Sequence, residues 1–478
     1  MNLDTSRPRS ELLDSNSEKI STLRRVINLT GGVLLTVSAV TPASSMFIIM
    51  PGAINQAGTG VVYSLVIAAA IGMIMALVYS ELASAYPSAG GEYVIVANIL
   101  GLRASYVVLV LNAIVMCLIA AVLALGAGDY FVAILPDVPP KVTAIVIIGL
   151  STLFGILHIK LNAWITGFFL TIELICIVFF AHLAGSHIAQ PLSVLWSPML
   201  AASGALHPTS LITIMFASAT VVFAFNGYEQ AVYLTEEIID AEKTIAKIII
   251  TSLWVSLIFE SIPTILLLLG SSDILSTVAS SSPFQDLIKR LAGDVALKYV
   301  SAGIAIAVLN ACIVTILTTA RFVYSTGRHG FWGARLGTRL SLIGESQGTP
   351  WFATLAVGAI GTAACFVNFN LLLVLTATGL IFVYCILCIC LLVGRSNGTT
   401  SQAKFKMPLP RVLPVVGIFA FVLIAATNFS DPDIGRPSLG WTFAEILAAL
   451  AIYEVVRRTG RASRIYDSIK NPAGRHQV

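Results

Sequence analysis

The chain has 478 residues, of which 57% are hydrophobic and 11% are charged. Soluble domains carry about 25% charged residues, so this composition excludes a water-soluble globule and predicts a protein whose partner is the lipid bilayer. The net charge of +4 gives no indication of nucleic-acid binding, and the sequence contains no Gly-x-x-x-x-Gly-Lys-Ser/Thr loop for ATP-driven transport.

The seven cysteines all lie inside apolar runs, so the sequence predicts no disulfide framework. Cys385, Cys388 and Cys390 have a spacing that resembles a metal site, but the stretch around them is hydrophobic and lacks polar neighbours. We therefore expect no metal and no other bound cofactor.

Twelve hydrophobic runs are long enough to be read as membrane spans with a window of about 19 residues. The predicted fold class is therefore an all-α membrane protein with twelve transmembrane helices. The runs lie near residues 28–56, 61–85, 104–134, 142–158, 162–183, 211–235, 245–270, 299–325, 351–368, 370–394, 412–428 and 438–456.

The distribution of lysine and arginine predicts the orientation of these spans. With the N-terminus inside, the inner segments hold 23 of the 28 basic residues and the outer segments hold five. Because cytoplasmic loops are rich in lysine and arginine, we expect a multi-pass protein of the plasma or inner membrane. The tails 1–27 and 457–478 are then both cytoplasmic.

Two outer segments are long, at residues 184–210 and 271–298. In the second, residues 281–290 read as a short amphipathic helix that follows a Ser/Pro break. A lid over an external vestibule and a plain connector both agree with this pattern.

The first predicted span contains a helix-breaking stretch from Val37 to Phe47. Pro42 removes a backbone donor and clashes with the preceding turn, while neighbouring hydroxyl side chains can bind the backbone groups that a break leaves open. The stretch predicts either an unwound segment or a simple proline kink.

The sixth span contains a second weak point, where the Asn226-Gly227 pair is followed by a carboxylate at Glu229. The first and sixth spans open two consecutive groups of five helices. Matching interruptions in two halves are typical of an inverted-repeat transporter whose substrate lies between the broken ends.

Helix dipoles predict which ligand suits these ends. The half-helix that begins near Ser45 presents N–H groups, and the half-helix that ends near Phe225 presents carbonyls. An amino acid could place its carboxylate on the first and its ammonium on the second. The predicted contact residues are Thr41, Ala43, Ser44, Ser45, Ala224, Phe225, Asn226 and Gly227.

Three motifs give the chain a resemblance to a known family. They are Glu81-Leu82 with Pro87 and Gly90-Gly91-Glu92-Tyr93, Phe225-Asn226-Gly227-Tyr228-Glu229 with Glu236-Glu237, and Arg321 with Tyr324 and Gly327-Arg328-His329-Gly330. Over the twelve-helix region the chain resembles the amino acid, polyamine and organocation permeases, and in particular the bacterial amino acid permeases.

The resemblance implies a five-plus-five inverted repeat at about 28–183 and 211–394, with helices 1 and 6 broken. This transport core, 28–394, would be followed by a loop and two extra helices at 395–456. It also implies secondary active transport by alternating access, not an enzyme, and an aromatic gate at Phe223.

One position departs from the family pattern. The family's first helix commonly carries Gly-Ser-Gly or Gly-Thr-Gly at the break, whereas this chain has Ala43-Ser44-Ser45. Added side chains narrow the space beside the backbone. A smaller or differently shaped amine therefore remains open as the substrate.

Four acidic residues lie inside predicted spans, with no lysine or arginine expected at the same depth: Glu173, Glu229, Glu260 and Glu445. A charge there is costly unless it is paired, hydrated or protonated. Glu229 matches the family's glutamate beside the break and is our first choice for proton coupling. The alternative is that it caps loose backbone donors.

Glu173 is a second candidate for coupling. The resemblance places it where some relatives carry a lysine in the position of a sodium ion, so a carboxylate there could bind a proton or attract a cation. Sodium is the rival coupling ion, since Asn310 and Thr315 supply oxygen atoms on a nearby span. Thr318 and Thr319 on the same span add further polar atoms, but intrahelical bonding to the backbone is the commoner role for all three threonines.

The expected partner is a small-molecule amino acid or amine, moved by symport or exchange. A polyamine or organic-cation carrier of the same architecture is the alternative. An intramembrane enzyme or a receptor would need a catalytic dyad, a metal cluster or a soluble domain, and the sequence displays none of these. The sequence leaves the exact substrate and the oligomeric state open.

Overall fold

The structure is a computed structural model that describes residues 23–128, 130, 137–429 and 432–470. Within these residues, eight helical stretches are long and apolar enough to cross a membrane: Leu29–Ala85, Leu102–Gly126, Ile159–Ser186, Leu211–Leu234, Ala241–Gly270, Pro283–Arg328, Phe369–Ser396 and Gly435–Arg458. Three shorter apolar helices accompany them: Pro140–Gly155, Trp351–Ala364 and Leu413–Asn428. The class of all-α membrane protein is thus confirmed, while twelve crossings and the inverted repeat stay predictions.

The first hydrophobic stretch is broken where the proline and hydroxyl residues predicted it. Helix α2 (Leu29–Val40) ends at Thr41, whose φ of 50° lies in the left-handed region. A short helix α3 (Pro42–Ser44) follows, with proline at its first position, where the missing N–H costs no helical bond. The chain then continues through a π-helical turn, η1 (Ser45–Ile49), into α4 (Met50–Ala57).

The second break also falls at the predicted Asn-Gly pair. Helix α11 (Leu211–Ala224) ends just before it, and a 3-10 segment, η4 (Tyr228–Leu234), follows it. Between them Gly227 has a φ of 119°, which only glycine adopts without strain.

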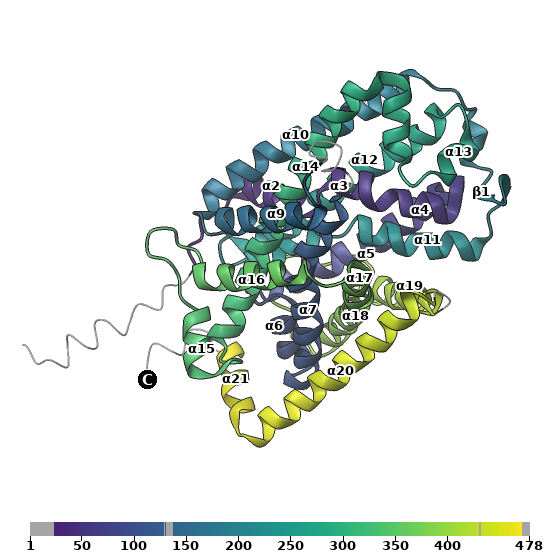
Figure 1. Ribbon diagram of the computed structural model, residues 1–478. Helices are drawn as coiled ribbons and strands as arrows, with labels where there is room; N and C mark the ends of the chain where they lie inside the picture. The colour runs from purple at the N-terminus through teal and green to yellow at the C-terminus, as the bar shows by residue number, and fades with distance from the viewer. Residues whose placement is uncertain (1–22, 129, 131–136, 430–431, 471–478) are drawn as a thin grey trace, which may run out of the picture.

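The remaining helices of the described residues either pack against these two interrupted segments or lie outside that layer (Figure 1). They are η2 (Gly58–Gly60), α5 (Val61–Ala85), α6 (Glu92–Ile99), α7 (Leu102–Gly126), α9 (Pro140–Gly155), α10 (Ile159–Ser186), η3 (Leu192–Leu195), α12 (Ala241–Gly270), α13 (Ile274–Ala279), α14 (Pro283–Arg328), α15 (Gly333–Leu340), α16 (Trp351–Ala364), α17 (Phe369–Ala377), α18 (Gly379–Ser396), α19 (Leu413–Asn428), α20 (Gly435–Arg458) and α21 (Arg461–Lys470).

The two long outer segments fold in different ways. In the second, α14 begins at Pro283, as the Ser/Pro break predicted, and continues past a kink at Gly293, whose φ is 81°. The first contains a hairpin of β1 (Met199–Ala202) and β2 (Ala205–Pro208), paired from Met199↔Pro208 to Ala202↔Ala205. The sequence analysis assigned no strand here, although Ser203-Gly204, both at positive φ, is a favoured two-residue hairpin turn.

Both ends of the described chain lie on one side of the molecule, here called the terminal face. Leu23 packs in one cluster with Tyr324 near the end of α14. The Ser468 hydroxyl in α21 donates to the His329 carbonyl at 3.1 Å, directly after the same helix. The end of α19 and the start of α20 lie on the other side, called the opposite face, toward which α4, α13 and β1 also extend (Figure 1).

Candidate functional site

The two helix breaks contact each other directly. The Ser45 hydroxyl donates to the Ala224 carbonyl at 2.8 Å, which joins the start of the second half of the first helix to the end of α11. Gly227 lies so close to α2 that a Cβ atom there would stand 2.7 Å from Val40 Cα. The glycine is therefore required by its φ and by the close approach of two backbones.

Glu173 on α10 binds the first break from the side. Its Oε1 accepts the Ala43 N–H at 2.8 Å and lies 3.2 Å from Thr41 Oγ1. Thr41 Oγ1 is also 2.9 Å from Ser44 Oγ. The Thr41 hydroxyl has one proton, so it donates to only one of these two acceptors at a time. Glu173 is completely buried. The carboxylate thus acts as a cap for a helix that starts inside the protein.

This contact corrects the expectation that the break offers a row of open donors. The Ser45 N–H bonds the Thr41 carbonyl at 3.0 Å, Pro42 has no N–H, and Ala43 is bound by Glu173. Ser44, the last residue of α3, lies in the first turn of this half-helix. The break therefore presents the positive end of a helix dipole and not a row of open donors.

A cavity of about 510 Å³ lies beside the two breaks and extends to the end of α19 and the start of α20, on the opposite face. Of the nine predicted contact residues, Ser44 and Phe223 line it. The residues around it are Ser44, Ile48, Ile49, Gln56, Val122, Leu123, Gly126, Phe216, Ala219, Thr220, Val222, Phe223, Phe369, Thr376, Leu380, Ile381, Tyr384, Phe421, Ile424, Asn428, Ile434 and Gly435.

The other seven predicted contact residues lie in the packing around the breaks. Thr41, Ala43 and Ser45 are held by the bonds described above, and Ala224 accepts one of them. Phe225 is 1% exposed. The Gly227 N–H donates to the side chains of Asn226 and Glu229, and Asn226 Oδ1 also accepts from the Tyr384 hydroxyl. They shape the site without facing the cavity.

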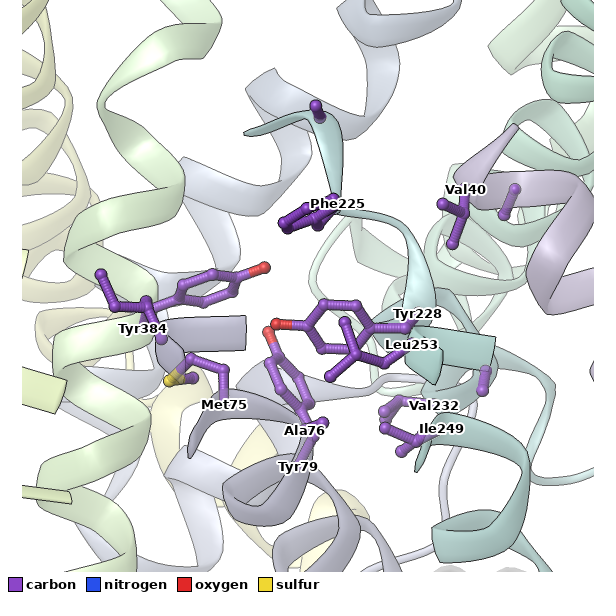
Figure 2. Close-up of a cluster of buried hydrophobic side chains, with 14 of the residues drawn as sticks. Val40, Met75, Ala76, Tyr79, Phe225, Tyr228, Val232, Ile249, Leu253 and Tyr384 are labelled. Atoms are coloured by element: carbon purple, nitrogen blue, oxygen red, sulfur yellow. The ribbon is translucent and has the colours of Figure 1, made fainter. Parts of the chain in front are cut away.

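Tyrosine hydroxyls converge below the cavity, toward the terminal face. Figure 2 shows the hydroxyl groups of Tyr79, Tyr228 and Tyr384 pointing toward one another. The Tyr384 hydroxyl donates to Asn226 Oδ1 at 3.1 Å, and the Tyr79 hydroxyl donates to a Glu92 oxygen at 3.0 Å. This cluster joins the second break to α18 and α6.

Glu229 has the contact that the capping alternative predicted. Its Oε2 accepts the Gly227 N–H at 2.9 Å, and the side chain is 6% exposed. It is not among the residues that line the cavity. Its role in coupling stays a prediction.

The four carboxylates inside the predicted spans are not paired with cations from the described residues. Within the described residues, no ion pair includes Glu173, Glu229, Glu260 or Glu445. Glu260 accepts from the Ser256 hydroxyl at 2.5 Å, whereas neither carboxylate oxygen of Glu445 has a partner.

The predicted sodium ligands on α14 differ in whether their polar atoms are already hydrogen-bonded. The Thr319 hydroxyl donates to the Thr315 carbonyl at 2.7 Å and the Thr318 hydroxyl to the Val314 carbonyl at 2.9 Å, so intrahelical bonding is confirmed. Among the described residues, neither side-chain polar atom of Asn310 has a partner at hydrogen-bond geometry, although the side chain lies near the Glu173 carboxyl group. The described residues contain no group of three His, Cys, Asp or Glu side chains placed to hold a metal.

Ion pairs close the terminal face. Arg321 of α14 is 0% exposed and makes a two-pronged bond to Glu237, which is 1% exposed. Arg328 binds both oxygens of Glu236, at 2.5 and 2.7 Å. Burial alone raises the pKa of Glu236, but the Arg328 guanidinium outweighs it, so this pKa lies below its ordinary value.

Sequence reasoning missed the wall that α19 contributes. Tyr384 of α18 and Thr376 of α17 line the cavity as part of the tenth predicted span, and Phe421, Ile424 and Asn428 line it from α19, a helix that the resemblance placed outside the transport core. The tenth span also carries a local signal, since the Thr-x-Thr-Gly sequence at 376–379 falls where α17 ends and α18 begins. No pattern in α19 distinguishes its cavity side.

Long apolar helices, two breaks that contact each other and a cavity beside them define a multi-pass membrane transporter. Residues 26–450 match the amino acid permease family, and the chain belongs to this family, within the amino acid, polyamine and organocation superfamily. An uncharacterized transporter of Mycobacterium tuberculosis is 25% identical over 93% of this chain and 94% of its own length.

Two relatives from Bacillus subtilis carry more specific names. The branched-chain amino acid permease BcaP is 23% identical over 91% of this chain and 94% of its own length. The methylthioribose transporter is 22% identical over 84% of this chain and 88% of its own length. The family and these relatives make the chain a transporter and not an enzyme.

Proposed function

We propose that the chain is a secondary active transporter that carries an amino acid across the membrane by alternating access. The proposal includes twelve crossings, a five-plus-five inverted repeat and both termini in the cytoplasm. The cavity reaches the opposite face while ion pairs close the terminal face. This arrangement supports an alternating-access carrier in a conformation that is open to one side of the membrane.

The observation that carries the proposal is the pair of helix ends beside the cavity. Ser44, which lines the cavity, carries its N–H in the first turn of the half-helix that begins with α3, at the positive end of the helix dipole. Val222 also lines the cavity, and its carbonyl, in the last turn of α11, accepts no hydrogen bond from a described residue. An α-carboxylate suits the first group and an α-ammonium suits the second.

Proton coupling is part of the proposal. A buried carboxylate without a cation is costly when ionised, and binding a proton removes that cost. Glu173 and Glu229 each touch one break, and neither is in an ion pair within the described part of the chain. Glu173 has the closer link to the proposed carboxylate site, because it holds the residue next to Ser44.

The polyamine or organic-cation alternative receives less support. None of the described residues that line the cavity is Asp or Glu, so no carboxylate faces a second ammonium group there. Glu173 and Glu229 are turned toward backbone donors outside the lining.

Uptake into proteoliposomes tests the function and the coupling together. Each common amino acid is offered in labelled form with an imposed proton gradient and without sodium. We expect at least one to accumulate, and we expect Glu173→Gln or Glu229→Gln to keep exchange while losing gradient-driven accumulation. Glu445→Gln is the matched control, because it makes the same change at a buried carboxyl group on α20.

Two results would contradict this proposal. Accumulation that requires sodium and ignores the proton gradient would exclude proton coupling. Accumulation of a diamine, with no amino acid bound or transported, would favour the organic-cation alternative.

A further inference from the structure

The cavity continues sideways from the breaks to α19. Here the lateral chamber means the part of the cavity lined by Phe216 of α11, Leu380 and Ile381 of α18, and Phe421 and Ile424 of α19. Helices α11 and α18 both pack against α19, so the chamber lies where the three helices meet. It belongs to the same cavity as Ser44 and Phe223.

We infer that the substrate is a neutral amino acid with a bulky apolar side chain, and that the lateral chamber receives this side chain. The inference rests on the proposed function, because it takes the backbone groups at Ser44 and Val222 as the site of the α-carboxylate and α-ammonium.

The chemistry of the chamber excludes a charged side chain. No Asp, Glu, Lys, Arg or His is among the described residues that line the cavity, and the five that define the chamber are all apolar. A second charge would lose its water without gaining an ionic partner. Lysine, arginine and diamines are therefore disfavoured relative to uncharged molecules of the same length.

The size of the cavity argues for a large side chain. About 510 Å³ is within the range of about 300–1,000 Å³ that small-molecule sites occupy. Glycine or alanine would leave the chamber empty of substrate atoms. Each methylene group that is buried strengthens binding by about fourfold, so leucine should bind about tenfold to a hundredfold more tightly than alanine.

The aromatic rings in the lining make one other ligand worth testing. Phe216, Phe223 and Phe421 could attract a quaternary ammonium group through their π faces. We favour the neutral side chain because three of the five residues that define the chamber are aliphatic. A quaternary amine is kept as an outcome of the test.

The first experiment measures binding to the full-length protein in lipid nanodiscs by the rise in melting temperature. The probes are alanine, leucine, phenylalanine, lysine and choline. We expect leucine and phenylalanine to stabilise the protein at concentrations at least about tenfold below alanine, and lysine and choline to have no effect. Binding of alanine or lysine in preference to leucine would overturn the inference and leave the proposed function standing. Binding of choline with no amino acid would overturn both.

The second experiment locates the side chain. Ile424→Trp fills the chamber from α19 and should weaken leucine and phenylalanine binding by at least about tenfold while affecting alanine less. Val422→Trp is the matched control, because Val422 is on the same helix and 59% exposed, so the added ring points away from the cavity. Equal loss for alanine and leucine in Ile424→Trp would overturn the placement.

The third experiment tests whether a variant gains lysine binding, so its result does not depend on a loss of binding. Asn428 lines the cavity at the end of α19, and Asn428→Asp adds a carboxylate of the same shape. If the chamber holds the far end of the substrate, this variant should bind lysine at least about tenfold better than the parent. Unchanged lysine binding, in a variant that still binds leucine, would show that the side chain does not reach α19.

Discussion

The ion pair between Arg321 and Glu237 is the strongest test of how the terminal face is closed. Two nitrogens of Arg321 bind the two carboxylate oxygens, and a third donates to the Leu317 carbonyl at 2.9 Å. The Glu237 carbonyl also accepts from the backbone N–H groups of Val26 and Ile27, at 2.8 and 2.9 Å. One residue thus holds both α14 and the segment before α2.

The cost of breaking this pair follows from its burial. Glu237→Gln leaves a guanidinium that is 0% exposed without an anion, and such a change costs about 3–5 kcal/mol. At about 1.36 kcal/mol for each factor of ten, the closed terminal face loses between about a hundredfold and a few thousandfold in population relative to conformations that expose Arg321 to water.

The assay compares Glu237→Gln, Arg321→Met and the double variant. Unfolding free energies in detergent should fall by about 3–5 kcal/mol in each single variant and by much less than the sum in the double variant, which buries no charge. Spin labels at Lys243 and Arg339, both exposed, should move apart in the single variants. The exposed Lys289–Asp294 pair, 62% and 70% exposed, is the control and should show a coupling below about 1 kcal/mol.

Two results would refute this reasoning. If the single effects add in the double variant to within about 0.5 kcal/mol, the two side chains do not stabilise each other. If the pair is coupled but the label distance stays unchanged in both single variants, the pair contributes to stability without closing the terminal face.

Three further predictions concern the breaks and the second ion pair. Gly227→Ala should abolish transport and lower the melting temperature more than Gly101→Ala, since both glycines have positive φ but only the first faces a backbone atom, at 2.7 Å. Ser45→Ala should cost about 1 kcal/mol in unfolding free energy by removing the bond to Ala224, and Ser45→Thr should recover most of it if the hydroxyl is what matters. The lowered pKa of Glu236 means that its stabilising contribution is present above the ordinary carboxyl pKa of about 4.3 and is lost as the pH falls through the lowered value. Melting temperatures of Glu236→Gln and the parent should therefore differ at pH 7 and converge in acid, and a constant difference would exclude this carboxylate as the cause.

The helices and both breaks could be predicted from the sequence because their causes are local. Pro42 cannot continue a hydrogen-bonded helix, and Asn226-Gly227 weakens one, whatever surrounds them. The predicted position of Ser44 beside the cavity had the same origin, since a residue just after a break lies in the first turn of the next half-helix, where N–H groups point out of the helix end.

The parts that sequence reasoning missed depend on contacts between distant segments. Glu173 lies 130 residues from Ala43, so no local pattern indicates that it binds the Ala43 N–H. Helix dipoles indicate where a helix end lies, but they do not indicate which backbone N–H groups a neighbouring helix already binds. The cavity wall from α19 is missed for the same reason, because the apolar residues of that helix look alike along the chain whether they face lipid or the cavity.

The position of Glu173 links the proposed substrate to the proposed proton. In the proposed pose the α-carboxylate binds the Ser44 N–H, one residue from the Ala43 N–H that Glu173 already holds at 2.8 Å. Two carboxylates so close together repel each other when both are ionised, so a proton on Glu173 favours binding of the substrate. Because such coupling is reciprocal, substrate binding must favour proton uptake by Glu173 to the same extent. Glu229 lies at the other break, beside the carbonyl end that would hold the ammonium, where a negative charge attracts the substrate instead. Of the two carboxylates, Glu173 is therefore the one whose protonation and substrate binding promote each other.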